Sequence, residues 1–273
     1  MKGLVRASHP EPTAAVTVLM TALAIAAGRG WGSGWVGLAV LAGQLSAGWS
    51  NDWIDRDRDR AAGRTDKPVV SGALAASTLG RWAAGALVAC VPLSFASGPR
   101  AAAAHLTGVG AAWAYNLRLK STALSVLPYA VAFGLLPSFV TLGLPGGGTA
   151  PWWATTAGAL LGSGAHFANT VPDLAVDAQT GVRGLPHRLG LTWSVALAAT
   201  LLGSAVVVLA IAPGVDTGRT VATAAAASVV ALVCVAGVVV AGLRGHPALG
   251  WRLTLATAAV AVGLLLARGG SLS

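Results

Sequence analysis

Apolar runs long enough to cross a membrane follow one another along almost the whole chain. A hydrocarbon core of about 30 Å requires about 20 helical residues, each rising about 1.5 Å. Nine such runs can be counted, and 55% of the residues are hydrophobic while only 10% are charged. We therefore predict an all-α integral membrane protein, residues 1–273, in which nine transmembrane helices form one bundle and one domain. The expected helices are residues 12–28, 34–56, 79–97, 100–118, 122–143, 152–177, 190–212, 219–242 and 249–267.

The distribution of Lys and Arg predicts the orientation, because cytoplasmic loops are enriched in both residues. The expected outer segments carry only Arg29, Arg100, Arg219 and Arg268, and every other basic residue falls on the expected inner side. The N-terminus is therefore expected in the cytoplasm and the protein in the plasma membrane. Because topology accounts for much of the net charge of +9, we expect the lipid bilayer as a partner and no nucleic acid.

Two sets of polar residues interrupt the apolar pattern at the inner ends of the second and sixth expected helices. The first set is Asn51, Asp55 and Asp59, and the second, 118 residues further on, is Asn169, Asp173 and Asp177. Residues four apart share one face of a helix, so each set predicts a polar stripe, and Asp52 flanks the first stripe. The same offset of 118 residues relates Gly63 to Gly181, Pro68 to Pro186 and Gly72 to Gly190. An internal repeat that relates helices two and six is therefore predicted.

The two stripes are expected to meet at one face of the membrane, because an even number of crossings separates them. Facing carboxylates repel one another by about 4 kcal/mol per pair at 4 Å and an effective dielectric of about 20, unless a cation lies between them. Carboxylate and Asn oxygens suit Mg²⁺, which completes its coordination with phosphate oxygens. The sequence thus predicts a magnesium diphosphate site that faces the cytoplasm. The alternative is that the acids only pair with Arg56, Arg58 and Arg60 in a solvated loop.

Three motifs resemble those of the UbiA superfamily of intramembrane prenyltransferases. The run Asn-Asp-Trp-Ile-Asp-Arg-Asp-Arg-Asp at 51–59, followed by Arg-Thr-Asp-Lys-Pro at 64–68, is similar to the first motif of that family. Residues 173–190, which end in Leu-Pro-His-Arg-Leu-Gly, resemble its second motif. Tyr115 and Lys120 resemble its Tyr and Lys loop. The resemblance covers essentially the whole chain.

This resemblance implies the roles of individual residues. Asn51, Asp52, Asp55 and Asp59 would hold one magnesium ion, and Asn169, Asp173 and Asp177 would hold another. Arg64, Lys67, Lys120 and Arg183 would bind the phosphate oxygens, and Tyr115 and Lys120 would be catalytic. For the four basic residues a role in topology alone is the alternative, because inner loops are basic in any membrane protein.

The chemistry also requires a dry cavity, because ionisation of an allylic diphosphate leaves a carbocation that water would destroy. Aromatic faces stabilise such a cation. The aromatic residues nearest the expected mouth are Trp49, Trp53, Tyr115 and Phe167. Their alternative role is helix packing.

His166 should share the face of Asn169 and Asp173, one to two turns deeper in the membrane. There it would orient an acceptor or receive the proton lost after alkylation. The alternative for this residue is a structural hydrogen bond between helices.

Three functions stay open at this point. The leading one is magnesium-dependent transfer of a prenyl group from a polyprenyl diphosphate to a small aromatic or lipid acceptor. The second is cyclisation of the prenyl diphosphate without an acceptor, which would use the same metal motifs. The third, a channel or transporter, is disfavoured because the acidic residues stop at one side of the membrane and offer no continuous polar path.

Overall fold

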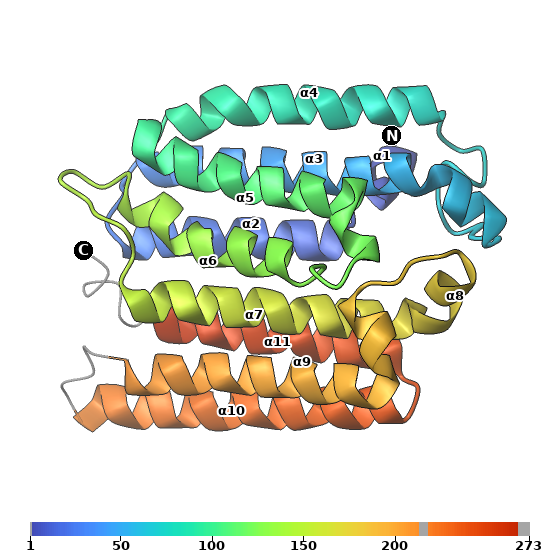
Figure 1. The fold of residues 1–273 in the computed structure, drawn as a ribbon. Coiled ribbons are helices and arrows are strands. Elements are labelled where there is room, and N and C mark those ends of the chain that lie inside the picture. Colours follow the sequence, from blue (N-terminus) through green and yellow to red (C-terminus); the bar gives the residue numbers. More distant parts are fainter. Residues whose placement is uncertain (1, 213–217, 267–273) are drawn as a thin grey trace.

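The computed structural model describes residues 2–212 and 218–266, and the regular structure within these ranges is entirely helical (Figure 1). Nine helices in the described ranges have 15 residues or more. They are α2 (Pro10–Ala26), α3 (Gly32–Ala61), α4 (Ala76–Phe95), α5 (Pro99–Leu117), α6 (Leu127–Thr141), α7 (Trp152–Thr170), α9 (Leu185–Ile211), α10 (Gly218–Leu243) and α11 (Pro247–Leu266). The short elements are α1 (Lys2–Ala7), η1 (Leu119–Ser121), η2 (Val171–Asp173) and α8 (Leu174–Gln179).

The long helices lie side by side in one bundle, and consecutive helices run in opposite directions (Figure 1). The segments 27–31, 96–98 and 142–151 lie at one end of this bundle. The C-terminal end of α3, the loop 62–75, η1 and α8 lie at the other end. Both acidic sets therefore belong to the same end of the molecule, as the even number of helices between them predicted.

Among the described residues, four helices are long and apolar enough to cross a membrane, namely Ala76–Phe95, Leu185–Ile211, Ala224–Leu243 and Ala248–Leu266. The helices α2 and α6 are apolar but shorter. These spans indicate a membrane protein. Nine membrane crossings and a cytoplasmic N-terminus stay predictions. Residue 267, at the end of the last predicted helix, and Arg268 lie outside the described residues, as does the side chain of Arg219.

The predicted continuous helix over 152–177 is wrong, because α7 ends at Thr170 and the chain continues through η2 into the separate helix α8. Pro172 explains the break, since proline has no N–H and its ring clashes with the preceding helical turn. Asn169, Asp173 and Asp177 therefore do not form a stripe on one helix. The first set does form its stripe, because α3 continues to Ala61.

Glycines related by the predicted repeat adopt similar backbone conformations. Gly63 has a φ of 67° and Gly181 one of 83°, while Gly72 and Gly190 have φ values of 77° and 78°. Only glycine adopts this left-handed region readily. Both pairs thus share a local turn, which supports the repeat, although the equivalence of the two halves stays a prediction.

Two glycines bring α6 and α7 close together. A Cβ atom on Gly158 would lie 2.5 Å from the carbonyl oxygen of Phe133, and one on Gly162 would lie 2.6 Å from that of Tyr129. Small residues allow such close approach of helix backbones. The contact places Tyr129 of α6 beside His166 of α7, with ring centroids 4.9 Å apart.

We expect Gly158→Ala to destabilise the protein by about 1–3 kcal/mol, because the added methyl group must push a backbone carbonyl away. Thermal unfolding in detergent should show a lower midpoint. Gly85→Ala is the matched control, since Gly85 lies on an exposed face of α4 and its Cβ would meet nothing within 4 Å. Equal losses of stability in the two variants would contradict the close packing of α6 on α7.

Candidate active site

A cavity of about 450 Å³ lies between α2, α3, α5, α6 and α7, and its polar end coincides with the end of the bundle that carries both acidic sets. The predicted site residues that line it are Asn51, Asp55, Asp59, Arg64, Lys67, Tyr115, Lys120, His166, Asn169, Asp173 and Asp177. Small and apolar residues such as Val40, Val109 and Leu136 line the remainder. The cavity thus combines a charged mouth with an apolar interior.

Three aromatic residues predicted for the cavity pack elsewhere. Trp49 donates from Nε1 to the carbonyl of Leu4 at 2.9 Å, and both Trp49 and Trp53 belong to a small core against α4. Phe167 is buried in a separate core between α7 and α9. On α3, Trp49 points away from the stripe of Asn51, because two residues correspond to about 200° of rotation. These three side chains therefore pack between helices and do not line the cavity.

Arg183 also lies outside the cavity lining, and its side chain is exposed. Its carbonyl oxygen accepts a hydrogen bond from Nε of Arg188 at 3.0 Å. A contact between Arg183 and a diphosphate would require a movement of this loop.

Asp55 and Lys120 form a buried ion pair at the mouth. Each side chain is only 8% exposed, and Arg58 also binds the Asp55 carboxylate, one turn further along α3. Removing one partner from such a pair leaves an uncompensated buried charge. The pair therefore fixes η1, and with it the end of α5, against α3.

Arg64 connects the loop after α3 to the second acidic set. Its Nη1 donates to Asp173 at 3.3 Å, and its Nε donates to Asp66 at 3.2 Å. The hydrogen bond from Arg64 lowers the pKa of Asp66, and the bond to Asp66 in turn raises the pKa of Arg64. Both groups thus stay ionised, and the loop after α3 reaches across the mouth to η2.

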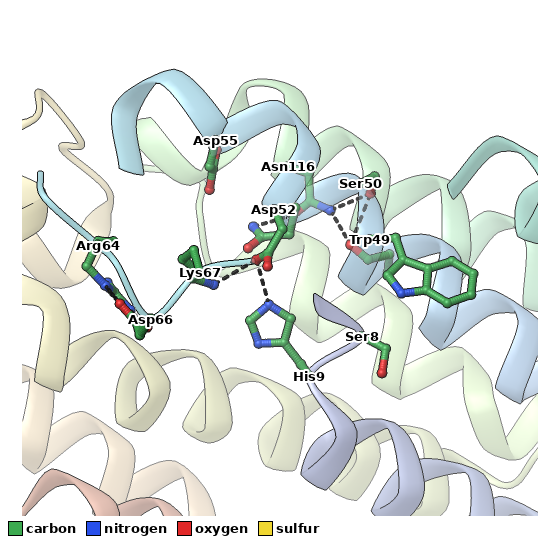
Figure 2. A network of polar contacts seen from close by, with 12 residues as sticks. Ser8, His9, Trp49, Ser50, Asp52, Asp55, Arg64, Asp66, Lys67 and Asn116 are labelled. Atoms are coloured by element: carbon green, nitrogen blue, oxygen red, sulfur yellow. Dashed lines mark hydrogen bonds and ion pairs between the residues drawn. The ribbon is translucent and has the colours of Figure 1, made fainter. Parts of the chain in front are cut away.

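Asp52 holds Lys67 in place without lining the cavity itself, and Figure 2 shows the contact between them. Its carboxylate is 2% exposed, accepts a hydrogen bond from Lys67 Nζ at 2.7 Å and lies 3.1 Å from His9 Nε2. Arg6 of α1 donates to the carbonyl of Asp66 at 3.0 Å. The N-terminal segment therefore fastens the loop 62–75 at the mouth. His9 was missed from the sequence because no motif marks an isolated histidine before the first long helix.

Asn116 orients the amide of Asn51. Nδ2 of Asn116 donates to the carbonyl of Ala47 at 2.8 Å and to Oγ of Ser50 at 2.9 Å, which fixes which amide atom is the oxygen. Its Oδ1 therefore faces Nδ2 of Asn51, at 3.1 Å. The Oδ1 atom of Asn51 is left for a ligand. Asn116 was overlooked although it follows Tyr115 directly.

The inner part of the site has an aromatic wall made of Tyr115, Tyr129, Phe133 and His166. The rings of Tyr115 and Tyr129 meet edge to face, with centroids 5.1 Å apart, and those of Tyr129 and Phe133 are stacked at 6.3 Å. Tyr129 and Phe133 were not predicted, because α6 is apolar on all sides and its sequence shows no cavity-facing stripe.

Within 2–212 and 218–266, no three His, Cys, Asp or Glu side chains converge as a ready metal site. The carboxylates are instead held apart in pairs with Lys120, Lys67 and Arg64. The donor set still fits Mg²⁺, since both acidic sets supply hard oxygen ligands to one mouth and Asn51 presents its amide oxygen.

The fold and the cavity define an intramembrane helical bundle that can bind an anionic head group at a charged mouth and an apolar group inside. The UbiA prenyltransferase family matches residues 14–242, and the chain belongs to this family.

One relative is the bacteriochlorophyll synthase 33 kDa chain of Cereibacter sphaeroides, which is 34% identical over 180 residues. The match covers 61% of this chain and 58% of that protein. Two solved structures share the fold at 17% identity. A UbiA homolog from Archaeoglobus fulgidus bound to GPP and Mg²⁺ has a TM-score of 0.67, with 99% of each chain covered. The apo UbiA homolog from Aeropyrum pernix K1 has a TM-score of 0.69, covering 91% of this chain and 96% of that one.

Asp52→Ala should destabilise the protein by about 3 kcal/mol, because it leaves the ammonium group of Lys67 without its buried carboxylate. Asp57→Ala is the control on the same helix. Asp57 is 68% exposed and pairs with Arg56 and Arg60 at the surface, so its loss should cost at most about 1 kcal/mol. Thermal unfolding in detergent measures both. Similar midpoints for the two variants would contradict the structural role of Asp52.

Proposed function

We propose that this protein is a magnesium-dependent intramembrane prenyltransferase that ionises a polyprenyl diphosphate and transfers its prenyl group to a small aromatic acceptor. The observation that carries the proposal is one cavity that combines a charged mouth with an apolar, aromatic interior. A prenyl diphosphate has the same two parts. Family membership and the relative named as a bacteriochlorophyll synthase support prenyl transfer.

The diphosphate would bind at the mouth, where Lys120, Arg64 and Lys67 line the cavity. These cations now neutralise Asp55, Asp173 and Asp52. On binding, Lys120 and Arg64 would turn from carboxylate oxygens to phosphate oxygens, where charge-assisted hydrogen bonds are strong. Lys67 would keep its contact with Asp52, which positions it.

Magnesium, when bound, would neutralise the carboxylates and the diphosphate and stabilise the departing pyrophosphate. The homolog structure with bound GPP and Mg²⁺ supports this assignment. The residues that would hold the metal are Asn51, Asp55 and Asp59 from α3 and Asn169, Asp173 and Asp177 from the second set. Asp52, predicted as a further ligand, is better explained as the partner of Lys67.

The interior would exclude water from the prenyl cation. The rings of Tyr115 and Tyr129 meet in the cavity wall, where their faces could stabilise positive charge on the reacting carbon. The apolar residues beyond them would receive the prenyl tail. We further propose that the bundle lies in the plasma membrane with the mouth toward the cytoplasm, as the basic loops indicate.

The purified protein in detergent should join geranyl diphosphate to an aromatic acceptor and release pyrophosphate only when Mg²⁺ is present. Mass spectrometry of the organic extract, with a panel of phenols as acceptors, measures the product. Asp55→Asn should reduce turnover by at least about 10³-fold, because it removes a charge on which metal binding depends. Asp57→Asn, at an exposed position, is the control.

Products formed without any acceptor would contradict the transferase assignment. A cyclic hydrocarbon or alcohol that requires Asp55 and Mg²⁺ would identify a terpene cyclase. Turnover that persists with a chelator present would contradict the magnesium site.

Asn116→Leu should raise the Mg²⁺ concentration needed for half-maximal turnover by about 10–100-fold, because the amide of Asn51 loses its orientation. The KM for geranyl diphosphate at saturating Mg²⁺ should change much less. Ser50→Ala is the control, since it removes one partner of Asn116 and keeps the bond to Ala47. An unchanged Mg²⁺ requirement in Asn116→Leu would show that Asn51 needs no positioning.

A further inference from the structure

The residue before α2 has a strained backbone. His9 has φ and ψ values of 51° and 67°, and it is the one non-glycine residue with a positive φ in the described part of the chain. A residue with a side chain stays in the left-handed region only where the surrounding structure imposes it, and such residues are concentrated at functional sites. His9 also lines the cavity.

Contacts of the neighbouring residues impose this conformation. The carbonyl oxygen of Ser8 accepts a hydrogen bond from Oγ1 of Thr13 at 2.7 Å, and that of His9 accepts one from the N–H of Thr13 at 3.2 Å. The Ser8 carbonyl also lies against α3, because a Cβ atom on Gly48 would come within 2.8 Å of its oxygen. The backbone around His9 is therefore fixed against α3.

The side chain of His9 reaches Asp52, one turn further along α3 (Figure 2). Gly48 and Asp52 are four residues apart and share one face of that helix. Nε2 of His9 lies 3.1 Å from Oδ1 of Asp52, and the same oxygen accepts the hydrogen bond from Nζ of Lys67. Since an ionised carboxylate can only accept hydrogen bonds, Nε2 of His9 carries the proton.

The two donors differ in how firmly they hold this oxygen. Lys67 has a long flexible stem, and the terminal torsion of an Asp side chain is soft, so the pair alone could turn as a unit. The imidazole ring is rigid and its backbone is fixed, so His9 determines where Oδ1 of Asp52 lies. With one N–H of Lys67 engaged at Oδ1, the direction of its other two donors is determined as well. Lys67 lines the cavity, as His9 does.

We propose that His9 is a positioning residue for the diphosphate group of the substrate. It holds Oδ1 of Asp52 in place, so that the free N–H donors of Lys67 point toward the phosphate oxygens. This inference rests on the proposed function, because it concerns the diphosphate site of that reaction. It adds the segment 2–9 to the substrate site, beside α3 and the loop 62–75.

The test is the affinity for two probes that need no turnover, inorganic pyrophosphate and the unreactive analogue geranyl S-thiolodiphosphate. Each is titrated with Mg²⁺ by calorimetry into the protein in nanodiscs. His9→Asn should bind both probes about tenfold more weakly, because the shorter amide cannot reach Asp52 and Lys67 loses its direction. His9→Gln, whose Nε2 can replace that of the imidazole, should bind them within about twofold of the wild type.

This pair of variants separates positioning from a role of the backbone alone. Asn adopts the left-handed region more readily than Gln, so a backbone role predicts that His9→Asn keeps its affinity and His9→Gln loses it. Positioning through the side chain predicts the opposite order. His246→Leu is the control, because His246 is exposed and does not line the cavity.

A double substitution tests whether His9 acts through Lys67. Lys67→Gln keeps a donor for Asp52 and loses the ammonium charge, so it should weaken pyrophosphate binding by itself. Adding His9→Asn to Lys67→Gln should then change the Kd by less than about twofold, since the group that His9 directs is already absent.

Equal affinity of the wild type and His9→Asn for pyrophosphate would overturn the inference. Fully additive effects of the two substitutions would also overturn it, and so would the order of affinities expected for a backbone role. A wild type that binds neither probe would overturn the proposed function together with the inference. Prenyl transfer from geranyl diphosphate is measured separately on the wild type, so failure of the transferase assignment and failure of the role of His9 give different results.

Discussion

The mouth of the cavity depends on the pairing of two buried carboxylates on α3 with cations from the loops. Asp55 binds Lys120 of η1, and Asp52 binds Lys67 of the loop 62–75. An isolated charge in such surroundings would cost several kcal/mol, so the C-terminal end of α3 is stable only when both loops fold over it. The ion pairs therefore give the loops their positions, and the loops give the cavity its charged end.

The ion pair between the loop 62–75 and the second acidic set is weaker than the ion pairs of Asp52 and Asp55. Arg64 and Asp173 are 29% and 44% exposed, so their ion pair contributes at most about 1 kcal/mol. Lys120 and Asp55 are far less exposed. The ion pair of Lys120 with Asp55 thus holds its part of the site in place before any ligand binds. Breaking the ion pair of Arg64 with Asp173 costs little free energy. This difference agrees with the break at Pro172, which separates Asp173 from the straight helix α7.

The sequence predicted the parts of the structure that follow from hydrophobic length and from spacing along a continuous helix. All nine runs became long helices, and the stripe on α3 formed because no proline or glycine interrupts residues 51–59. The length of the apolar run gave no sign of the break at Pro172, so the predicted stripe of Asn169, Asp173 and Asp177 was wrong. Trp49 and Trp53 were assigned by nearness in sequence, although helical rotation turns them toward α4. Tyr129 became part of the site only through the contact of α6 with α7, which a uniformly apolar helix does not reveal.

Side chains whose hydrogen bonds are already made within the protein orient the few polar groups of this mostly apolar cavity. Asn116 uses both N–H donors on Ala47 and Ser50, so the Asn51 amide can only turn its oxygen outward. Oγ of Ser125 accepts a hydrogen bond from the backbone N–H of Leu185 and lies 3.0 Å from Nε2 of His166, so the imidazole ring is held in place beside Tyr115. A directed amide oxygen at the mouth and a fixed aromatic wall thus belong to one cavity. A prenyl diphosphate whose head group bound at the mouth would have its reacting carbon near this wall, where aromatic faces can stabilise positive charge.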